Sequence, residues 1–279
     1  MENKACLLAD RGVIKVAGAD ATALLHRLVT NSVLDIRAGE SRYSALLTPQ
    51  GKLMFDFFLV PLPEGADAGY LIDCVRDQSA ELAKRLNLHK LRAKITIEDQ
   101  SEAFGVAAIY QGEALSGVDA VFYRDMRAEN MGMRLIASRD LLAKIADAND
   151  SGYEAHRIAA GVPKGGVDFI YGDAFVQDAN LDWLNGVDFK KGCYVGQEVV
   201  ARVHYRNSAR KRIVKFRFEG DAPAHGAQIV AGGAPLGQVG STARFEGLAM
   251  VRLDRLEDAR ATGATVKAGE MPIDVMAPG

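Results

Sequence analysis

The sequence KKGCYVGQE, residues 190–198, constrains the fold and function of this chain most, because it places a cysteine between glycines and directly after two lysines. A thiol beside cationic side chains and near a helix N-terminus is favoured as its thiolate, the form that attacks electrophiles and binds metals. Downstream, Val195, Val199 and Val203 recur at a spacing of four, which predicts an amphipathic helix. The pattern places Cys193 at or just before the first turn of this helix.

A lone cysteine is more often a small buried hydrophobe than a reactive group. A buried thiol needs neither two preceding lysines nor a following Gly-Gln-Glu, and a glycine in an early helical turn costs about 1 kcal/mol relative to alanine. The flanking residues therefore favour chemistry, with Cys193 as a redox thiol or a transient iron ligand. Lys191 is the candidate cation that holds the thiolate or pairs with an anionic group of a ligand.

The motif resembles the signature of the YgfZ family, folate-binding relatives of the glycine-cleavage T-protein that are implicated in assembling or repairing iron–sulfur proteins. Four further segments match the family pattern in the right order: RIAAGVP at 157–163, DAF at 173–175, NLD at 180–182 and ARKR at 209–212. The resemblance implies an α+β, T-protein-like fold. Two ferredoxin-like lobes would surround a central folate pocket, and a C-terminal β-barrel would follow.

Local patterns predict strands and helices that fit this plan. A strand over 13–16 precedes a helix that starts at Ala21 with Asp20 as its N-cap, and Thr48-Pro49-Gln50-Gly51 has the composition of a type I turn between strands. The returning strand, 52–60, alternates large apolar residues on one face with Asp56 among those of the other. Further elements are expected over 70–74 (strand), 79–88 (helix), 94–97 (strand) and 153–160 (helix ended by Gly161).

The character of the sequence changes after residue 207, where alternating strands and closely spaced glycines predict a small β-barrel. We therefore expect two regions. Residues 1–206 form the folate-binding α+β part, with the division between its lobes near 98–150, and residues 210–279 form the barrel. Asn207 to Ala209 is the expected linker.

Five residues are expected to bind tetrahydrofolate on the strength of the resemblance. Asp56 would hydrogen-bond the amide and amino edge of a pterin, although T-protein relatives that transfer an aminomethyl group carry an acidic pair where this chain has Phe55-Asp56. Tyr153 would stack on the ring. The motif members Tyr194, Gln197 and Glu198 complete the set. Without the resemblance, Asp56 is equally consistent with a surface carboxylate, and Tyr153 is more typical of a core aromatic.

The composition is that of an ordinary globular protein, with 48% hydrophobic and 25% charged residues among 279 and a net charge of −2. This small negative charge argues against a protein that constantly binds nucleic acid or an anionic membrane. No run reaches the roughly 18 apolar residues of a membrane span, and the first residues lack the apolar core of a signal peptide, so a cytoplasmic location is expected. The three cysteines form no Cys-x-x-Cys pair, so any metal at Cys193 needs ligands from elsewhere.

Three hypotheses about function follow. The first is a tetrahydrofolate-binding accessory factor for iron–sulfur protein maturation, with A-type cluster carriers or client proteins as partners. The second is a folate-dependent aminomethyltransferase, and the third is a nucleophilic enzyme in which His156 or His204 activates Cys193. Two departures from the family pattern, Val176 in place of proline and Asn207 in place of glycine, predict a less rigid segment before the motif and a turn that asparagine still tolerates.

Overall fold

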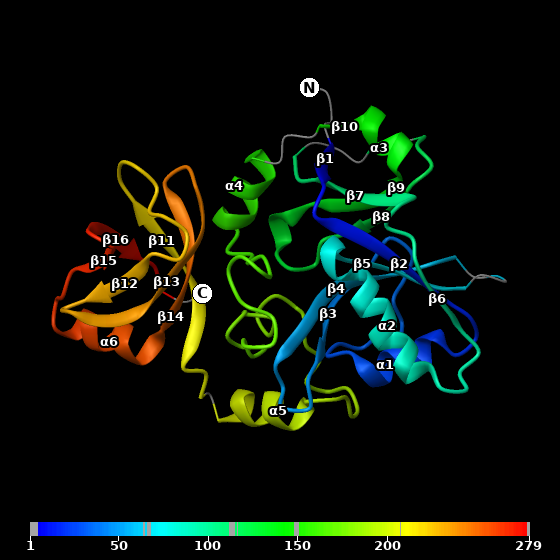
Figure 1. The fold of residues 1–279 in the computed structure, drawn as a ribbon, viewed down its shortest axis with the longest axis horizontal. Coiled ribbons are helices and arrows are strands. Elements are labelled where there is room, and N and C mark those ends of the chain that lie inside the picture. Colours follow the sequence, from blue (N-terminus) through cyan, green and yellow to red (C-terminus); the bar gives the residue numbers. More distant parts are fainter. Residues whose placement is uncertain are drawn as a thin grey trace.

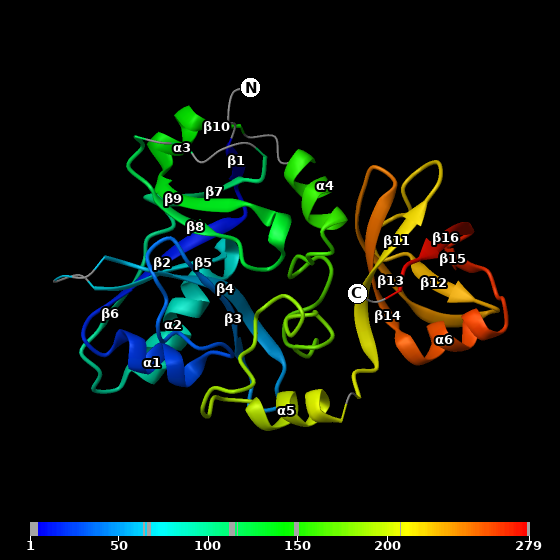
Figure 2. The same cartoon turned by 180° about the vertical axis from the view of Figure 1, so that it is seen from behind.

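The computed structural model describes residues 5–63, 65, 68–111, 115, 117–147, 151–206 and 208–277. Two α+β lobes lie side by side, and the C-terminal β-barrel stands next to them, as Figures 1 and 2 show from opposite sides. Helix α4 (Ser151–Ala159) and the first part of the irregular segment 160–196 lie between the lobes and the barrel, and the last part of the segment runs along the first lobe next to α5. This is the α+β architecture with a C-terminal barrel that the sequence predicts.

The first lobe is a five-stranded sheet in the order β3-β4-β5-β2-β6, with two helices packed on one face. Its elements are β2 (Arg11–Ala17), α1 (Ala21–Leu28), β3 (Arg42–Leu47), β4 (Leu53–Pro61), β5 (Gly69–Val75), the 3-10 turn η1 (Arg76–Gln78), α2 (Ser79–Lys90) and β6 (Thr96–Asp99). Asp20 stands at the N-cap position of α1, but its carboxylate accepts from the Lys94 backbone N–H at 2.7 Å instead of capping the helix. The predicted N-cap bond is therefore absent.

The hairpin between β3 and β4 is confirmed, with Gly51 N–H donating to the Thr48 carbonyl at 2.9 Å. Gly51 has φ +79°, a left-handed backbone that favours glycine. Strand β4 is buried on both faces, because Phe57 faces the helices of its own lobe while Phe58 packs into the core shared with the second lobe. The predicted alternation is present, but neither face is open to solvent.

The second lobe is a five-stranded sheet in the order β10-β1-β7-β9-β8. Its elements are β1 (Ala5–Leu8), β7 (Phe104–Ile109), β8 (Val121–Arg124), the 3-10 turn η2 (Glu129–Met131), β9 (Met133–Ser138), α3 (Arg139–Ile145) and β10 (Ala146–Asp147). Strand β1 lies between β7 and β10, although the next strand in the sequence, β2, belongs to the first lobe.

The helices that flank the irregular segment end and begin at glycines. Helix α4 is followed by Gly161 with φ +72°, as the sequence predicts. Helix α5 (Gln197–Tyr205) begins later than the valine spacing suggests, because Gly196 at its N-cap adopts φ +82°. Val176, where the family pattern has proline, is completely buried. Asn207 lies outside the described residues, so the turn expected there is not described.

The C-terminal barrel closes in the order β11-β14-β13-β12-β15-β16, with β16 returning to β11. Its elements are β11 (Lys211–Phe218), β12 (Gln228–Ala231), β13 (Ala234–Ala243), β14 (Glu246–Arg252), α6 (Leu253–Ala261), β15 (Val266–Ala268) and β16 (Met271–Val275). The barrel has its own apolar interior, whereas the largest core of the molecule joins both lobes, the irregular segment and the near wall of the barrel. The cavity and loops described below sit on this shared core.

Candidate functional site

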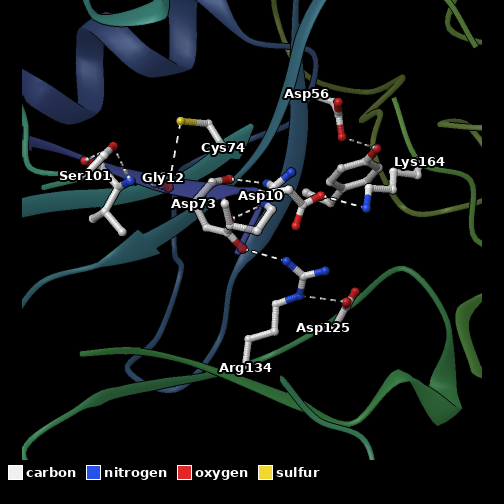
Figure 3. A network of polar contacts seen from close by, with 12 residues as sticks. Asp10, Gly12, Asp56, Asp73, Cys74, Ser101, Asp125, Arg134 and Lys164 are labelled. Carbon is white, nitrogen blue, oxygen red and sulfur yellow. Dashed lines mark hydrogen bonds and ion pairs between the residues drawn. The ribbon is translucent and has the colours of Figure 1, made fainter. Parts of the chain in front are cut away.

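A cluster of buried charges fills the space where the two lobes meet, and Figure 3 shows Arg134 reaching both Asp73 and Asp125. Arg134 comes from β9 of the second lobe and donates to Asp73 on β5 of the first lobe at 2.7 Å and to Asp125 at 3.0 Å. Arg11 on β2 pairs with Asp73 at 2.5 Å, and Arg127 pairs with Asp125 through two hydrogen bonds of 2.9 and 2.6 Å. Both carboxylates are thus held by two arginines.

These pairings keep the carboxylates ionised despite their burial. Burial alone would raise the pKa of Asp73, but the charges of Arg11 and Arg134 hold it below its ordinary value. Burial would likewise raise the pKa of Asp125, but the charges of Arg127 and Arg134 outweigh it and lower this pKa to about 2. Because removal of either carboxylate would take the ion-pair partner from a largely buried arginine, Arg11 or Arg127, the cluster acts as an electrostatic joint between the lobes.

Asp56 and Tyr153, two of the predicted folate residues, lie beside this joint and line one cavity of about 60 Å³. Asp56 accepts a hydrogen bond from Tyr43 at 2.8 Å on one carboxylate oxygen and another from Tyr171 on the second. The Tyr153 hydroxyl accepts from Arg134 at 2.7 Å, and its ring packs edge-on against Tyr110 with 5.7 Å between centroids. Both predicted residues are therefore engaged in protein contacts.

The cavity does not fit tetrahydrofolate in this arrangement. Pockets that hold ligands of this size are about 300–1,000 Å³, several times the volume beside Asp56. A carboxylate that binds the amide and amino edge of a pterin uses both of its oxygens, and each oxygen of Asp56 already accepts a hydrogen bond from a tyrosine. The residues present therefore do not accommodate the expected cofactor.

The motif loop presents Cys193 to solvent, while Cys6 and Cys74 are buried. The loop packs on the turn of the β3–β4 hairpin, because a Cβ at Gly196 would lie 2.7 Å from the Thr48 carbonyl oxygen and one at Gly51 would lie 2.9 Å from Val199. Cys193 precedes the N-cap by three residues, slightly further upstream than the sequence predicts. Burial raises the pKa of Cys74 to about 12, which makes that thiol unreactive at neutral pH.

Lys191 anchors the motif loop. Its ammonium donates to the backbone carbonyls of His26 and Val29, each at 2.5 Å, and of Asn31 at 3.1 Å, which lie at and beyond the end of α1. Burial lowers the pKa of Lys191 to about 8. The three hydrogen bonds match the three donors of an ammonium group, so the structure gives Lys191 a positioning role that its sequence context does not reveal.

The remaining motif residues lie with the loop and not with the central cavity. Tyr194 is buried, with the Lys191 ammonium 5.1 Å from its ring centroid, and Gln197 and Glu198 open helix α5. None of the three lines the cavity beside Asp56 among the residues that the structure describes. The structure thus divides the predicted site into a closed cluster and an exposed loop.

The two histidines considered as activators of Cys193 are engaged elsewhere. His204 stacks on Phe189, with ring centroids 3.6 Å apart and planes 15° apart, and His156 bonds the Asn130 carbonyl oxygen at 2.7 Å. These contacts argue against a cysteine–histidine nucleophile. Among the described residues no three His, Cys, Asp or Glu side chains gather as a metal site, and no helix there is both long and apolar enough to cross a membrane.

A second polar cluster, which the sequence did not reveal, fastens the barrel to the body. Arg157 on α4 donates to Asp168 at 3.1 Å and to the Ser241 hydroxyl of β13 at 2.7 Å. The Ser241 backbone N–H donates to the other Asp168 oxygen at 2.6 Å. A Cβ at Gly240 would collide with Asp168, so glycine is needed for this close approach.

Comparison with known proteins places this geometry in a family. Residues 210–279 match the family model of the CAF17 C-terminal beta-barrel domain. The chain is 31% identical over 285 residues to the mitochondrial iron–sulfur cluster assembly factor IBA57 of Homo sapiens, with 91% of this chain and 79% of that protein covered. It is 34% identical over 240 residues to the mitochondrial IBA57 homologue of Coccidioides immitis, of which it spans 56%.

The fold is also that of a solved T-protein. The crystal structure of glycine cleavage system aminomethyltransferase T from Bartonella henselae superposes with a TM-score of 0.75 at 16% identity, covering 98% of this chain and 85% of that one. This confirms the expected T-protein-like fold and, at such low identity, the fold alone.

The relatives contradict the expected cytoplasmic location, because they are named as mitochondrial proteins. That expectation rested on the lack of an apolar signal segment, which bears on secretion and membrane insertion but not on mitochondrial import, since transit peptides are amphipathic and not apolar. The relatives are named IBA57, so the expected resemblance to YgfZ is refined to that family. With the human protein matched over 79% of its length and the T-protein fold established, the chain belongs to the IBA57 family.

Proposed function

We propose that this protein is an accessory factor in the maturation of iron–sulfur proteins, and that the thiol of Cys193 is its reactive group. The names of its relatives support the process, and the exposure of Cys193 supports the residue. A thiolate is a preferred ligand of iron in such clusters. The exposure of this thiol, in contrast to the burial of Cys6 and Cys74, is the single observation that carries the proposal.

The surroundings of Cys193 suit a thiol that meets another molecule. Lys191 and the contact of Gly196 with the β3–β4 turn fix both ends of the loop, so the thiol is held out on an anchored segment. The residues described offer no cluster of further metal ligands, so the remaining ligands of a cluster would come from a partner. An A-type cluster carrier or a client apoprotein is the expected class of partner, with the cluster as cargo.

Aminomethyl transfer is the rival function that the fold permits. It requires a folate bound next to a carboxylate that handles a proton, whereas Asp56 is held by Tyr43 and Tyr171 beside a cavity of about 60 Å³. No contact in the described residues favours this rival, and tetrahydrofolate forms no part of the proposed mechanism.

The test is genetic rescue. Cells that lack this gene receive the wild-type chain, Cys193→Ala or the neighbouring control Lys190→Ala at matched protein levels, and the activity of a [4Fe–4S] enzyme is measured. We expect the wild type and Lys190→Ala to restore activity and Cys193→Ala to restore less than about a tenth of it. Full rescue by Cys193→Ala would remove the thiol from the mechanism, and failure of the wild type would remove the process.

A further inference from the structure

We infer that Tyr171 closes the central cavity against tetrahydrofolate, so that this member of a T-protein-like fold works without a folate at Asp56. Tyr171 is thereby a specificity-determining residue that acts by exclusion. The inference concerns the central cluster and is independent of the function proposed for Cys193.

Tyr171 bonds Asp56 directly and lies against Gly165, which lines the cavity. Its hydroxyl donates to one Asp56 oxygen, opposite the bond of 2.8 Å from Tyr43 to the other. Burial, and then the charge of Asp56, raises the pKa of Tyr171, so the hydroxyl stays protonated and keeps donating at neutral pH. A ligand that used the acceptor positions now taken by Tyr171 and Tyr43 would have to displace both tyrosines.

The segment that carries Tyr171 is bonded to β4 just after this residue and forms a turn just before it. Gly172 N–H donates to the Leu53 carbonyl on β4 at 2.6 Å, and Gly166 N–H donates to the Phe169 carbonyl at 2.8 Å. The buried Phe169 ring packs edge-on against Tyr171 with 5.3 Å between centroids. The Tyr171 hydroxyl also lies so close to Gly165 that any Cβ there would overlap it. The closed position is therefore supported by the backbone on either side.

Tyr153, the aromatic residue that lines the cavity, is equally held by its neighbours. Tyr153 has 4% of its surface exposed, and its hydroxyl accepts from Arg134 at 2.7 Å and from Arg127 at 3.3 Å. Its ring faces Tyr110 edge-on. Moving Tyr153 to stack on a pterin would break hydrogen bonds to two arginines of the joint between the lobes, which makes Tyr171 the easier of the two barriers to remove.

The experiment is calorimetric titration of the purified full-length chain with 5-formyltetrahydrofolate. We expect the wild type to show no saturable binding at ligand concentrations up to about 1 mM. Tyr171→Ala removes the ring and frees one Asp56 oxygen, so we expect binding with a Kd below about 100 µM, at least a tenfold gain. Tyr171→Phe keeps the ring in place and is expected to stay silent, and Asp56→Ala in the Tyr171→Ala background is expected to abolish the gain.

Two results would overturn the inference. Saturable one-to-one binding by the wild type that Asp56→Asn removes would show that the cavity opens to folate. A folded Tyr171→Ala that still fails to bind would show that Tyr171 is not the closing group. Thermal unfolding of each variant establishes that it is folded, and Tyr171→Leu, which retains apolar contact with Phe169, replaces the alanine variant if the latter unfolds. Because this assay measures ligand binding and the rescue assay measures enzyme maturation in cells, the two proposals fail separately.

Discussion

The central charged cluster and the motif loop differ in which of their side chains are buried. In the cluster, Arg11, Arg127 and Arg134 pair with buried carboxylates, and the cavity beside them has a volume of about 60 Å³. In the loop, burial falls on the anchor, Lys191, and the thiol of Cys193 is left exposed. Perturbed, buried charges are often taken as marks of an active site. Here they mark a structural joint, and Cys193, which we propose as the reactive group, lies outside it.

The largest effect is expected from removing the centre of the joint. Arg134→Ala leaves Asp73 and Asp125 each with one partner fewer in a buried setting, which we expect to lower the free energy of unfolding by about 3–5 kcal/mol. Urea denaturation followed by fluorescence measures this, with the exposed Arg206→Ala as the control, expected within about 0.5 kcal/mol of wild type. A loss below about 1 kcal/mol would mean that the joint does not bear on stability.

The next effect separates anchoring from electrostatics in the loop. Lys191→Met removes the donor from three backbone carbonyls, and we expect a loss of about 1.5–3 kcal/mol in the free energy of unfolding. Lys190→Met, at the exposed neighbour, is the matched control and should change little. If Lys191→Met keeps full stability but loses rescue activity, then Lys191 acts through its charge on Cys193 and not as an anchor.

Acid tests the joint through Asp125. The pKa of Asp125 is about 2 in the folded protein against an ordinary 3.8, so the folded state takes up this proton less readily than the unfolded state. Ionised Asp125 therefore stabilises the folded state by about 2 kcal/mol above about pH 5. This stabilisation falls by about 1 kcal/mol at pH 3 and is lost below pH 2. The stability gap between the wild type and Asp125→Asn should therefore narrow by these amounts in urea denaturation series at pH 5, 4 and 3. A gap that does not change with pH would show that Asp125 is not held ionised.

The smallest effect on stability is expected at Cys193. Cys193→Ser should change the free energy of unfolding by less than about 0.5 kcal/mol, because the side chain is exposed. The same variant should abolish the fast reaction of the native protein with an aromatic disulfide reagent. Cys6 and Cys74 are buried and should react only after unfolding. Fast reaction of a second thiol in the native state would erase the contrast between exposed and buried cysteines.

Much of the fold could be predicted because its signals are local. The turn from Thr48 to Gly51 needs a left-handed residue at its end, and the helix before Gly161 ends where glycine is required. The prediction for the strand over 94–97 was two residues early: the structure begins it at Thr96, and Lys94 instead bonds Asp20 across the lobe. Tertiary contacts of this kind are invisible to a local pattern.

The joint could not be predicted, because its members come from β2, β5, β9 and the loop after β8, and no spacing in the sequence connects them. One signal was present, since Asp73 and Arg134 are charged residues within otherwise apolar strands, and such a charge must find a partner. The motif loop was recognised from its sequence, but the role of Lys191 depends on the end of α1, more than 150 residues earlier in the chain.

The crossing of the chain from β1 to β2 bears on how the protein emerges from the ribosome. Strand β1 pairs with β7 and β10, so about a hundred further residues must be translated before residues 5–8 can join their sheet. Strand β2 instead pairs with β5 and β6 of the first lobe. Long-range pairing of this kind slows folding. A fragment that ends before β7 would carry β1 as an unpaired apolar edge, exposed to aggregation until translation proceeds. The sheet of the first lobe can therefore form once residue 99 is made, whereas the sheet of the second lobe waits for residues 104–147.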